Sequence, residues 1–387
     1  MIIKTIKLYD SEPYAAEFSA KVISCEKINN TYGVVLDRTL FFPEEGGQAC
    51  DVGEINGIKV EKVEIKNGVV THLMPSEFTP ESKVNGKIDF LFRYRNMQNH
   101  SGEHIFSGLV NKTLGFNNVG FHLGSTDMTM DYDGELTSAQ IEELEDKVND
   151  VIYENIDIIA KYYDSAQLED ILYRSKLSLT EDVRIVTIGK YDTCACCAPH
   201  VARTGEIGIF KVTDFYRYKG GTRVHALCGV DALKDYRQKH NMAKQLTALL
   251  SSKPEDTVCS VQHLMGENSR LSADISAVTR KYCLKLAQDI PQDSEKAVIF
   301  EDDISRSGMQ IIANAAMQKA KWCAVFSRTS KNTFSFVIAS EVFSAKDILA
   351  SLSKNLGAKG GGNDKMVQGT VVSSKKEIEQ ILHTILF

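Results

Sequence analysis

The feature that most restricts the fold is a change of pattern near residue 90, where turn-rich β-type sequence gives way to helical periodicity. Short runs of β-forming residues, such as 33–36 and 58–63, are separated by Asn-Gly pairs at Asn56-Gly57, Asn67-Gly68 and Asn85-Gly86. Both residues of such a pair tolerate a positive φ, which a type I′ hairpin turn requires. Hairpins at this density predict a small antiparallel β-barrel over residues 1–90.

The segment that follows predicts helices and strands together. Residues 95–114 carry apolar side chains at helical spacing, and Gly115 is a typical helix end. Residues Thr137 to Gln140 have the form of a capping box, which predicts the start of a second helix. Residues 183–188 predict a strand that leads into a cysteine cluster. We therefore expect an α+β domain over residues 91–230.

The remaining chain predicts a helical linker and a further domain. Residues 231–290 are helical in pattern with a break near Pro254, and an apolar stripe recurs there at close to heptad spacing, at Leu264, Leu271, Ile275, Val278 and Tyr282. Such a stripe fits the seam of a homodimer or, equally well, a helix packed on its own domain. Residues 291–387 alternate between strand and helix patterns, with a glycine-rich loop after residue 356, and predict an α/β domain. The expected fold class is thus α+β multidomain.

Charge and composition exclude some classes of protein. The net charge of −6 argues against a protein that coats nucleic acid through bulk charge, although a local basic patch stays possible. No apolar run approaches the roughly 18–20 residues of a membrane span, and the N-terminus lacks the pattern of a signal peptide. Three of the nine cysteines fall within residues 194–197, which indicates metal or redox chemistry in a reducing compartment. We expect a cytoplasmic protein without a membrane partner.

Two short motifs predict a zinc site. His100 and His104 are four residues apart on a predicted helix, so both imidazoles can reach one ion. Cys196 and His200 have the same spacing on a later turn, and together the two pairs supply the four N and S ligands that Zn²⁺ prefers. Cys194 and Cys197 are also within reach, and we select Cys196 for its spacing from His200.

The first motif has a second interpretation. The residues 100–104 also spell the His-x-x-Glu-His pattern of inverzincin metalloproteases, in which Glu103 would be the general base. That class needs a downstream carboxylate as third ligand, whereas this sequence offers a cysteine and a histidine. The protease interpretation is therefore the weaker alternative.

Several motifs in a fixed order resemble one family over essentially the whole chain. They are FPEEGGQ at 42–48, MQNHSGEH at 97–104, Cys196-x₃-His200, TGEIG at 204–208 and GAKGGG at 357–362. This pattern resembles the freestanding alanyl-tRNA editing proteins of the long AlaX type, with a DHH-associated domain at the C-terminal end. The chain departs from the family at Cys196-Cys197-Ala198-Pro199-His200, where relatives carry Cys-Gly-Gly-Thr-His. It has no Asp-His-His triplet and no recognisable aminoacylation domain, so ATP binding is not expected.

The resemblance implies a function and a set of site residues. The implied activity is zinc-dependent hydrolysis of alanine tRNA that carries serine or glycine. Thr39 would read the serine hydroxyl, Gly46 and Gly47 would bring backbone N–H groups to the substrate, and Gln48 and Glu103 would act in catalysis. The tRNA would contact two groups of residues, which are Arg217, Lys219 and Arg223, and then Lys359, Gly360, Gly361 and Gly362. The alternative from another class is a tRNA-binding module with structural zinc and no hydrolysis.

Overall fold

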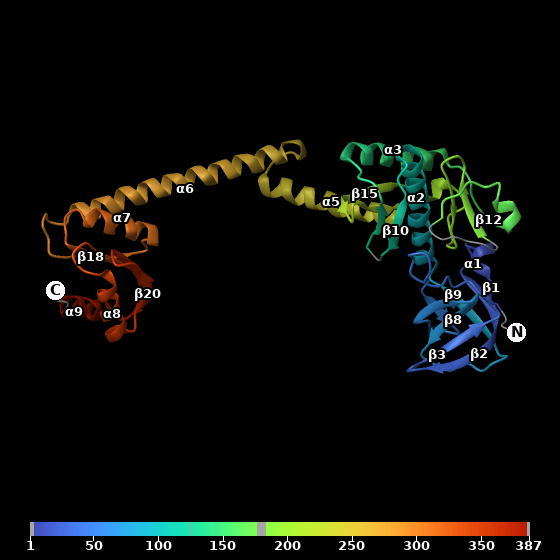
Figure 1. The fold of residues 1–387 in the computed structure, drawn as a ribbon, viewed down its shortest axis with the longest axis horizontal. Coiled ribbons are helices and arrows are strands. Elements are labelled where there is room, and N and C mark those ends of the chain that lie inside the picture. Colours follow the sequence, from blue (N-terminus) through green and yellow to red (C-terminus); the bar gives the residue numbers. More distant parts are fainter. Residues whose placement is uncertain (1–3, 125, 176–182, 385–387) are drawn as a thin grey trace. The chain divides into compact units, whose positions relative to one another are not determined.

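The computed structural model describes residues 4–124, 126–175 and 183–384 and divides into two compact units, Met1–Lys244 and Gln245–Phe387. Both units mix helices with sheets, which confirms the α+β multidomain class (Figure 1). The finer boundaries at residues 90, 230 and 290 stay a prediction. Within the described residues, every helix is too short or too polar to cross a membrane.

The first unit begins with a seven-stranded antiparallel sheet in the order β6-β5-β9-β2-β3-β8-β7. Its strands are β2 (Glu17–Ile28), β3 (Thr31–Leu36), β5 (Gly53–Ile55), β6 (Ile58–Lys59), β7 (Lys62–Lys66), β8 (Val69–Met74) and β9 (Lys83–Ile88). A short helix α1 (Leu8–Ser11) follows β1 (Ile6–Lys7), which pairs with β4 (Arg38–Thr39). The sheet encloses its own apolar core, which includes Val22, Val34 and Phe41.

Two expectations for this region were wrong. Within the described residues the sheet is open, because the ladder ends at β6 and β7, so it is not a closed barrel. The Asn56-Gly57 and Asn67-Gly68 pairs do adopt positive φ at tight turns, as predicted. Asn85-Gly86 instead lies inside β9, where the ring of Phe18 lies within 2.2 Å of the position that a Gly86 Cβ would occupy. That glycine makes room for a ring and not for a turn.

The buried His72 in this sheet should make the folded protein less stable in acid. The ring of His72 is fully buried; its Nδ1 hydrogen-bonds the Val34 carbonyl and its Nε2 hydrogen-bonds the Thr39 hydroxyl. Burial lowers the pKa of His72 from 6.5 to about 4. The folded state therefore keeps the neutral ring, whereas the unfolded chain binds a proton once the pH falls below about 6.5. The contribution of His72 to the free energy of unfolding is fully present above pH 6.5. It decreases as the pH falls towards 4, and the total loss is at most roughly 3 kcal/mol.

The matching experiment compares His72→Gln with the wild type in denaturant titrations between pH 7 and pH 4.5. We expect the variant to be less stable at pH 7 but to lose less of its remaining stability on acidification. His263→Gln is the control, because His263 is 69% exposed at its side chain. Equal acid sensitivity of His72→Gln and wild type would contradict the prediction.

The long helix α2 (Phe90–Leu114) leaves the first sheet and crosses the rest of the unit (Figure 1). Asp89 caps its start through the Phe92 amide, and Gly115 ends it with a φ of 74°. It begins five residues earlier than the predicted range, because the Asp89 cap lies upstream of the apolar pattern. Nearly all of its middle is buried, which makes it the central element of the second core.

Two further sheets and a helix pack around α2. The first sheet has the order β10 (Asn118–Leu123), β11 (Met128–Tyr132), β16 (Gly221–Cys228) and β15 (Phe210–Tyr218), and the second consists of β12 (Ile158–Tyr163), β13 (Val183–Ile188) and β14 (Asp192–Ala195). Helix α3 (Ser138–Glu154) starts with the predicted capping box of Thr137 and Gln140. A short helix α4 (Ser165–Leu168) and the 3₁₀ turn η1 (Thr204–Ile207) complete this region.

The second unit contains a mixed five-stranded sheet with helices on both faces. Its strands are β17 (Ala297–Asp302), β18 (Trp322–Ser330), β19 (Thr333–Ser340), β21 (Met366–Val372) and β20 (Lys359–Gly362). Helix α7 (Arg306–Ala316) contributes to one core, whereas α8 (Ala345–Leu356) and α9 (Lys375–Thr384) contribute to the other. The glycine-rich segment is an edge strand and not the expected loop.

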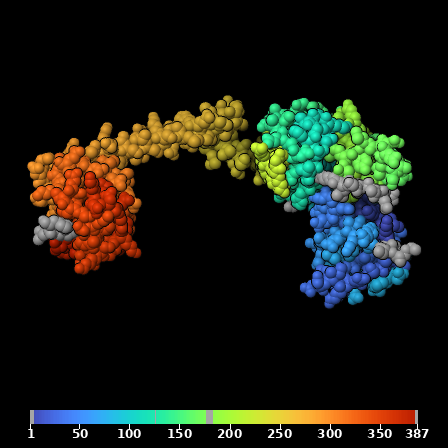
Figure 2. Space-filling model, viewed as in Figure 1, coloured from blue at the N-terminus to red at the C-terminus, as the bar shows by residue number. Residues whose placement is uncertain are grey.

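The segment 231–290, predicted to be helical, consists mainly of two helices. Helix α5 (Gly229–Leu250) crosses the boundary between the units, and α6 (Thr257–Gln288) follows the short turn η2 (Pro254–Asp256). The break at Pro254 is therefore confirmed. Figure 2 shows most of α6 extending away from the globular part of the second unit.

Candidate metal centre

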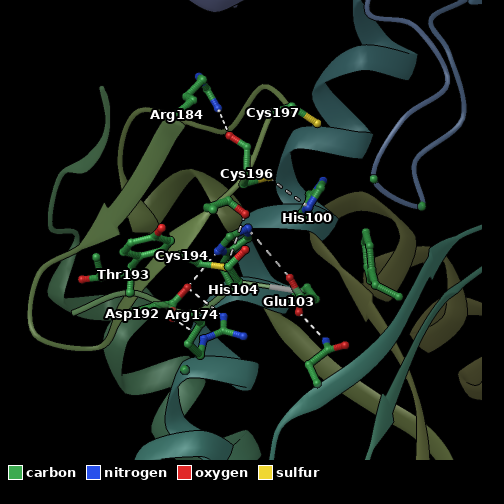
Figure 3. Close-up of a pocket in the computed structure, with 18 of the residues that line it drawn as sticks. His100, Glu103, His104, Arg174, Arg184, Asp192, Thr193, Cys194, Cys196 and Cys197 are labelled. Atoms are coloured by element: carbon green, nitrogen blue, oxygen red, sulfur yellow. Dashed lines mark hydrogen bonds and ion pairs between the residues drawn. The ribbon is translucent and has the colours of Figure 1, made fainter. Parts of the chain in front are cut away.

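The four predicted zinc ligands lie together in the first unit, and Figure 3 shows three of them, His100, His104 and Cys196. His100 and His104 are one turn apart on α2, whereas Cys196 and His200 follow the end of β14. One donor atom from each residue lies within 4.8 Å of the other three. The Sγ of Cys196 is 3.6 Å from the Nε2 of His100 and 3.4 Å from the Nε2 of His200. Two distant parts of the chain thus direct four donor atoms to one point.

A polar side chain holds the other nitrogen, Nδ1, of each histidine. The three pairs are His100 with Gln48 at 2.9 Å, His104 with Asp192 at 2.8 Å and His200 with Ser101 at 3.1 Å. The Oε1 of Gln48 and the carboxylate of Asp192 only accept hydrogen bonds, so the Nδ1 atoms facing them carry the protons. This arrangement leaves the Nε2 lone pairs of those two rings available for a metal.

Two distances between donors match those expected between ligands of one tetrahedral metal ion, taking zinc as the reference. Typical Zn–N and Zn–S bonds of about 2.0–2.1 Å and 2.3 Å place neighbouring N and S ligands about 3.5 Å apart. The two sulfur–nitrogen distances of 3.6 and 3.4 Å lie on either side of that value. The donor set of three imidazoles and one thiolate is also one that zinc prefers.

The electrostatics of the three cysteines single out Cys196. Burial raises the pKa of the Cys196 thiol, but the neighbouring His100 and His200 outweigh burial and hold the pKa well below its ordinary value. Burial raises the pKa of Cys194 to about 11 and also raises the pKa of Cys197. Because the thiolate is the form that binds metals, Cys196 is the cysteine best suited to the cluster.

Asp192 orients a ligand and does not itself face the cluster centre. Its oxygens accept from the Nε and Nη2 of Arg174 at 2.8 and 2.9 Å and from the Nδ1 of His104. Burial alone would raise the pKa of Asp192, but these donors lower it; burial alone would lower the pKa of His104, but Asp192 raises it. Asp192, His104 and Cys194 also form a possible metal-binding group. Since the carboxylate is already occupied, we assign it to ligand orientation.

Three of the four candidate ligands, His100, His104 and Cys196, line a cavity of about 1020 Å³. Glu103 lines this cavity beside the ligands: its Oε1 accepts from Ser107 at 2.6 Å and from Asn118 at 2.7 Å. Its Oε2 lies 3.9 Å from the Nε2 of His104. One oxygen is therefore fixed by donors, and the other lies near the nitrogen that faces the cluster. The volume is at the upper end of ordinary ligand sites of roughly 300–1,000 Å³, so it has room for more than an amino acid.

The Gly46-Gly47 turn brings the N-terminal sheet to this cavity. Both glycines line it and have positive φ, at 62° and 83°. A Cβ on Gly47 would lie 2.2 Å from the Phe121 carbonyl oxygen, which explains why the position needs glycine. Gln48, next in the chain, is buried against His100 and so contacts a metal ligand.

Thr39 lies elsewhere in the N-terminal sheet region. It is fully buried on β4, does not line the cavity, and its hydroxyl is engaged by His72 and by the Phe41 amide. Its role in reading serine stays a prediction.

The predicted tRNA contacts fall in different units. Arg217, Lys219 and Arg223 surround the β15–β16 turn, where Arg217 pairs with Glu135, and Arg223 pairs with Asp131 and stacks 3.8 Å from the centre of the Tyr218 ring. Lys359 to Gly362 form the exposed strand β20. A second cavity of about 340 Å³ is lined by part of that strand and by Arg306 at the start of α7.

Sequence reasoning missed the residues that hold the ligands. Asp192 belongs to no recognisable motif and lies 88 positions from the histidine that it contacts, whereas Ser101 lies inside the motif at 97–104 but was given no role. The side chains that bond to the Nδ1 atoms come from elements that pack against the histidines only in the folded protein. The spacing of residues along the sequence therefore does not predict them. Ser101, next to His100, was the one with a local signal.

Comparisons with known proteins support the family resemblance. Residues 183–226 match the model of the threonyl and alanyl tRNA synthetase second additional domain, and residues 10–91 match class II (A) tRNA synthetases. Alanyl-tRNA editing protein AlaX-L of Pyrococcus horikoshii is 29% identical, over 96% of each chain. Alanyl-tRNA editing protein Aarsd1 of Mus musculus is 25% identical, over 97% of each.

Matches to longer proteins and to solved structures cover a smaller share of one of the two chains. The alanine–tRNA ligase of Methanococcus maripaludis is 26% identical over the full length of this chain but only 44% of its own. The crystal structure of the C-Ala domain from Aquifex aeolicus alanyl-tRNA synthetase covers 24% of this chain and 88% of that domain, at 18% identity and a TM-score of 0.21, which is too low to support an argument. The full-length matches confirm that this chain is similar, over nearly its whole length, to the freestanding alanyl-tRNA editing proteins.

Proposed function

We propose that the protein hydrolyses the ester bond of alanine tRNA mischarged with serine or glycine, acting in trans in the cytoplasm. The observation that carries this proposal is the convergence of three imidazoles and the Cys196 thiol, whose donor atoms lie within 4.8 Å of one another. His100, His104 and Cys196 line the cavity together with Glu103. The full-length similarity to editing proteins supports the substrate class. Such an activity has a physical reason, because a pocket built for alanine cannot strongly reject a side chain that only adds a hydroxyl.

Zinc is the metal that best fits the donor set, held by His100, His104, Cys196 and His200. When bound, it supplies a Lewis acid beside the scissile ester. Gln48, Asp192 and Ser101 hold the three rings in place. In this proposal the Oε2 of Glu103 takes the proton of the attacking water, while Ser107 and Asn118 fix the other oxygen.

The charged segments are proposed as tRNA contacts. Lys219 lies at the exposed β15–β16 turn and Lys359 on the exposed edge strand β20, where each can meet a phosphate. Arg217 and Arg223 would exchange their carboxylate partners for phosphates or keep them as positioning contacts. Gly361 gives a ligand close access to the backbone, because a Cβ there would have no neighbour within 4 Å, whereas a Cβ on Gly360 would lie 2.4 Å from the Gln368 carbonyl oxygen.

The test of this function is a deacylation assay on alanine tRNA charged with serine, with glycine or with alanine. We expect wild-type protein to release serine faster than the spontaneous rate and to spare alanine. The Glu103→Gln variant should keep its metal and lose activity by about 10²–10⁴-fold, the usual contribution of a general base. Glu142→Gln is the matched control, because Glu142 is an exposed carboxylate on α3. Full activity of Glu103→Gln would remove Glu103 from the mechanism.

The same assay distinguishes the hydrolase from the second candidate function, a tRNA-binding module with structural zinc. Four protein ligands around one ion is also the pattern of structural zinc. If the wild-type protein binds tRNA and metal but releases serine only at the spontaneous rate, it is a tRNA-binding module and not a hydrolase. A metalloprotease would instead cleave peptides and need a carboxylate as third ligand, a position that Cys196 and His200 fill here.

A homodimer through α6 is a further part of the proposal. The stripe of Leu264, Leu271, Ile275, Val278 and Tyr282 is between 45% and 66% exposed. Asn268 falls in the same stripe, and an asparagine in a coiled-coil core favours a paired register. We expect light scattering to give a dimeric mass for wild type and a monomeric mass for Leu271→Asp. Ser276→Asp, just off the stripe, should stay dimeric; a monomeric wild type would contradict the proposal.

A further inference from the structure

We propose that Glu45 binds the α-ammonium group of the aminoacyl ester, so that the site accepts free aminoacyl groups and disfavours N-blocked ones. This inference rests on the proposed function and adds a specificity residue to it. Every aminoacyl ester carries an ammonium one carbon from its carbonyl, whereas peptidyl and N-acyl esters carry a neutral amide there. A carboxylate at the right place can therefore separate the two classes by charge.

Glu45 is held in a fixed relation to the metal ligands by a tight turn. The Glu45 amide donates to the Gln48 carbonyl at 3.2 Å, and the Gln48 amide donates to the Glu45 carbonyl at 3.1 Å. Gly46 and Gly47 between them have the positive φ values of a type I′ turn. Since the Gln48 side chain is bonded to His100, the turn places Glu45 against the same cluster.

The Glu45 side chain lacks a partner for one of its oxygens. It lines the cavity, yet its Oε2 is shielded from solvent and has no hydrogen-bond donor within the described residues. A shielded charged acceptor without a donor is unfavourable. Because the terminal torsion of glutamate is broad, the carboxylate can rotate to present this oxygen to a ligand.

The location of Glu45 fits the end of the substrate near the scissile bond. The next residue, Gly46, lies against Cys197, since a Cβ on Gly46 would be 3.6 Å from the Cys197 sulfur, and Cys197 directly follows the ligand Cys196. Figure 3 shows Cys197 near His100 and Glu103 near His104. A substrate carbonyl at the cluster can thus face Glu103 and direct its ammonium to Glu45.

The other two carboxylates of the cavity already have partners. Within the described lining, the acidic residues are Glu45, Glu103 and Asp192. Asp192 is bound by Arg174 and His104, and Glu103 accepts from Ser107 and Asn118. Glu45 is therefore the carboxylate with the most unused acceptor capacity for a cationic group.

The experiment uses two non-hydrolysable probes, 3′-(L-seryl)amino-3′-deoxyadenosine and its N-acetyl form, and measures their affinity for the full-length, metal-loaded protein by calorimetry. We expect wild type to prefer the free-amino probe, and Glu45→Gln to reduce this preference by roughly 10- to 100-fold, the range for a charged hydrogen bond. Glu44→Gln is the matched control on the same turn, because Glu44 is exposed and pairs with Lys62. It should keep the wild-type preference.

Two results with the Glu45→Gln variant would overturn the inference. Equal loss of affinity for both probes would show a merely structural role, and an unchanged preference would show that Glu45 does not meet the ammonium. Deacylation of seryl- and N-acetylseryl-tRNA is measured in parallel. If wild type cleaves neither, the proposed hydrolase function fails, yet the probe affinities still decide whether Glu45 recognises the ammonium.

Discussion

Replacing Cys196 by alanine should remove both the bound zinc and the release of serine. The variant keeps three imidazoles but lacks the thiolate, which lies 3.4 and 3.6 Å from two of their nitrogens. With one of four ligands missing, the site loses its only anionic donor and much of its affinity for the ion. We expect metal analysis to give near-zero zinc and the deacylation rate to fall to the spontaneous rate.

Cys194→Ala is the matched control for that experiment. Cys194 lines the same cavity two residues away, but burial raises the pKa of its thiol to about 11, so it stays protonated at neutral pH. The control should retain zinc and activity. If Cys194→Ala lost the metal while Cys196→Ala kept it, the ligand assignment would be wrong; a folded, metal-free Cys196→Ala that still released serine would refute the role of zinc.

Replacing Arg93 by methionine should destabilise the first unit more than any surface change. Arg93 and Asp51 form an ion pair with fully buried side chains, and the Arg93 guanidinium also donates to the carbonyls of Leu40 and Pro13. Methionine fills similar space but leaves the Asp51 carboxylate buried without its cation. Breaking such a pair typically lowers the free energy of unfolding by about 3–5 kcal/mol.

Denaturant titration of the wild type and the variant measures this effect. Arg38→Met is the control, because the Arg38 side chain is 46% exposed beside Asp37 and its pair should contribute little. A loss below about 1 kcal/mol for Arg93→Met would mean that water or a rearranged side chain satisfies Asp51. Because Arg93 joins α2 to the strands around the Gly46-Gly47 turn, the variant should also weaken metal binding.

Local signals in the sequence predicted local structure well. The capping box at Thr137, the turns at Asn56 and Asn67, and the helix break at Pro254 all depend on groups a few residues apart. The spacing of His100 and His104 was informative for the same reason, since one helical turn places both rings on one face. The same local reasoning failed at Asn85-Gly86, where the Phe18 ring, far away in sequence, determines the need for glycine.

The sequence by itself determined which residue types can bind a metal and several local features, such as the start of α3 and the helix break at Pro254, because those properties depend on neighbours along the chain. Only the tertiary structure decided that Asp192, Ser101 and Gln48 hold the three imidazoles. It also decided that, among the described residues, the N-terminal sheet stays open and one Glu45 oxygen at the cavity has no hydrogen-bond donor. Strand pairing and hydrogen bonds between distant residues depend on which surfaces pack together. That choice is made by burial across the whole unit, and no short stretch of sequence encodes it.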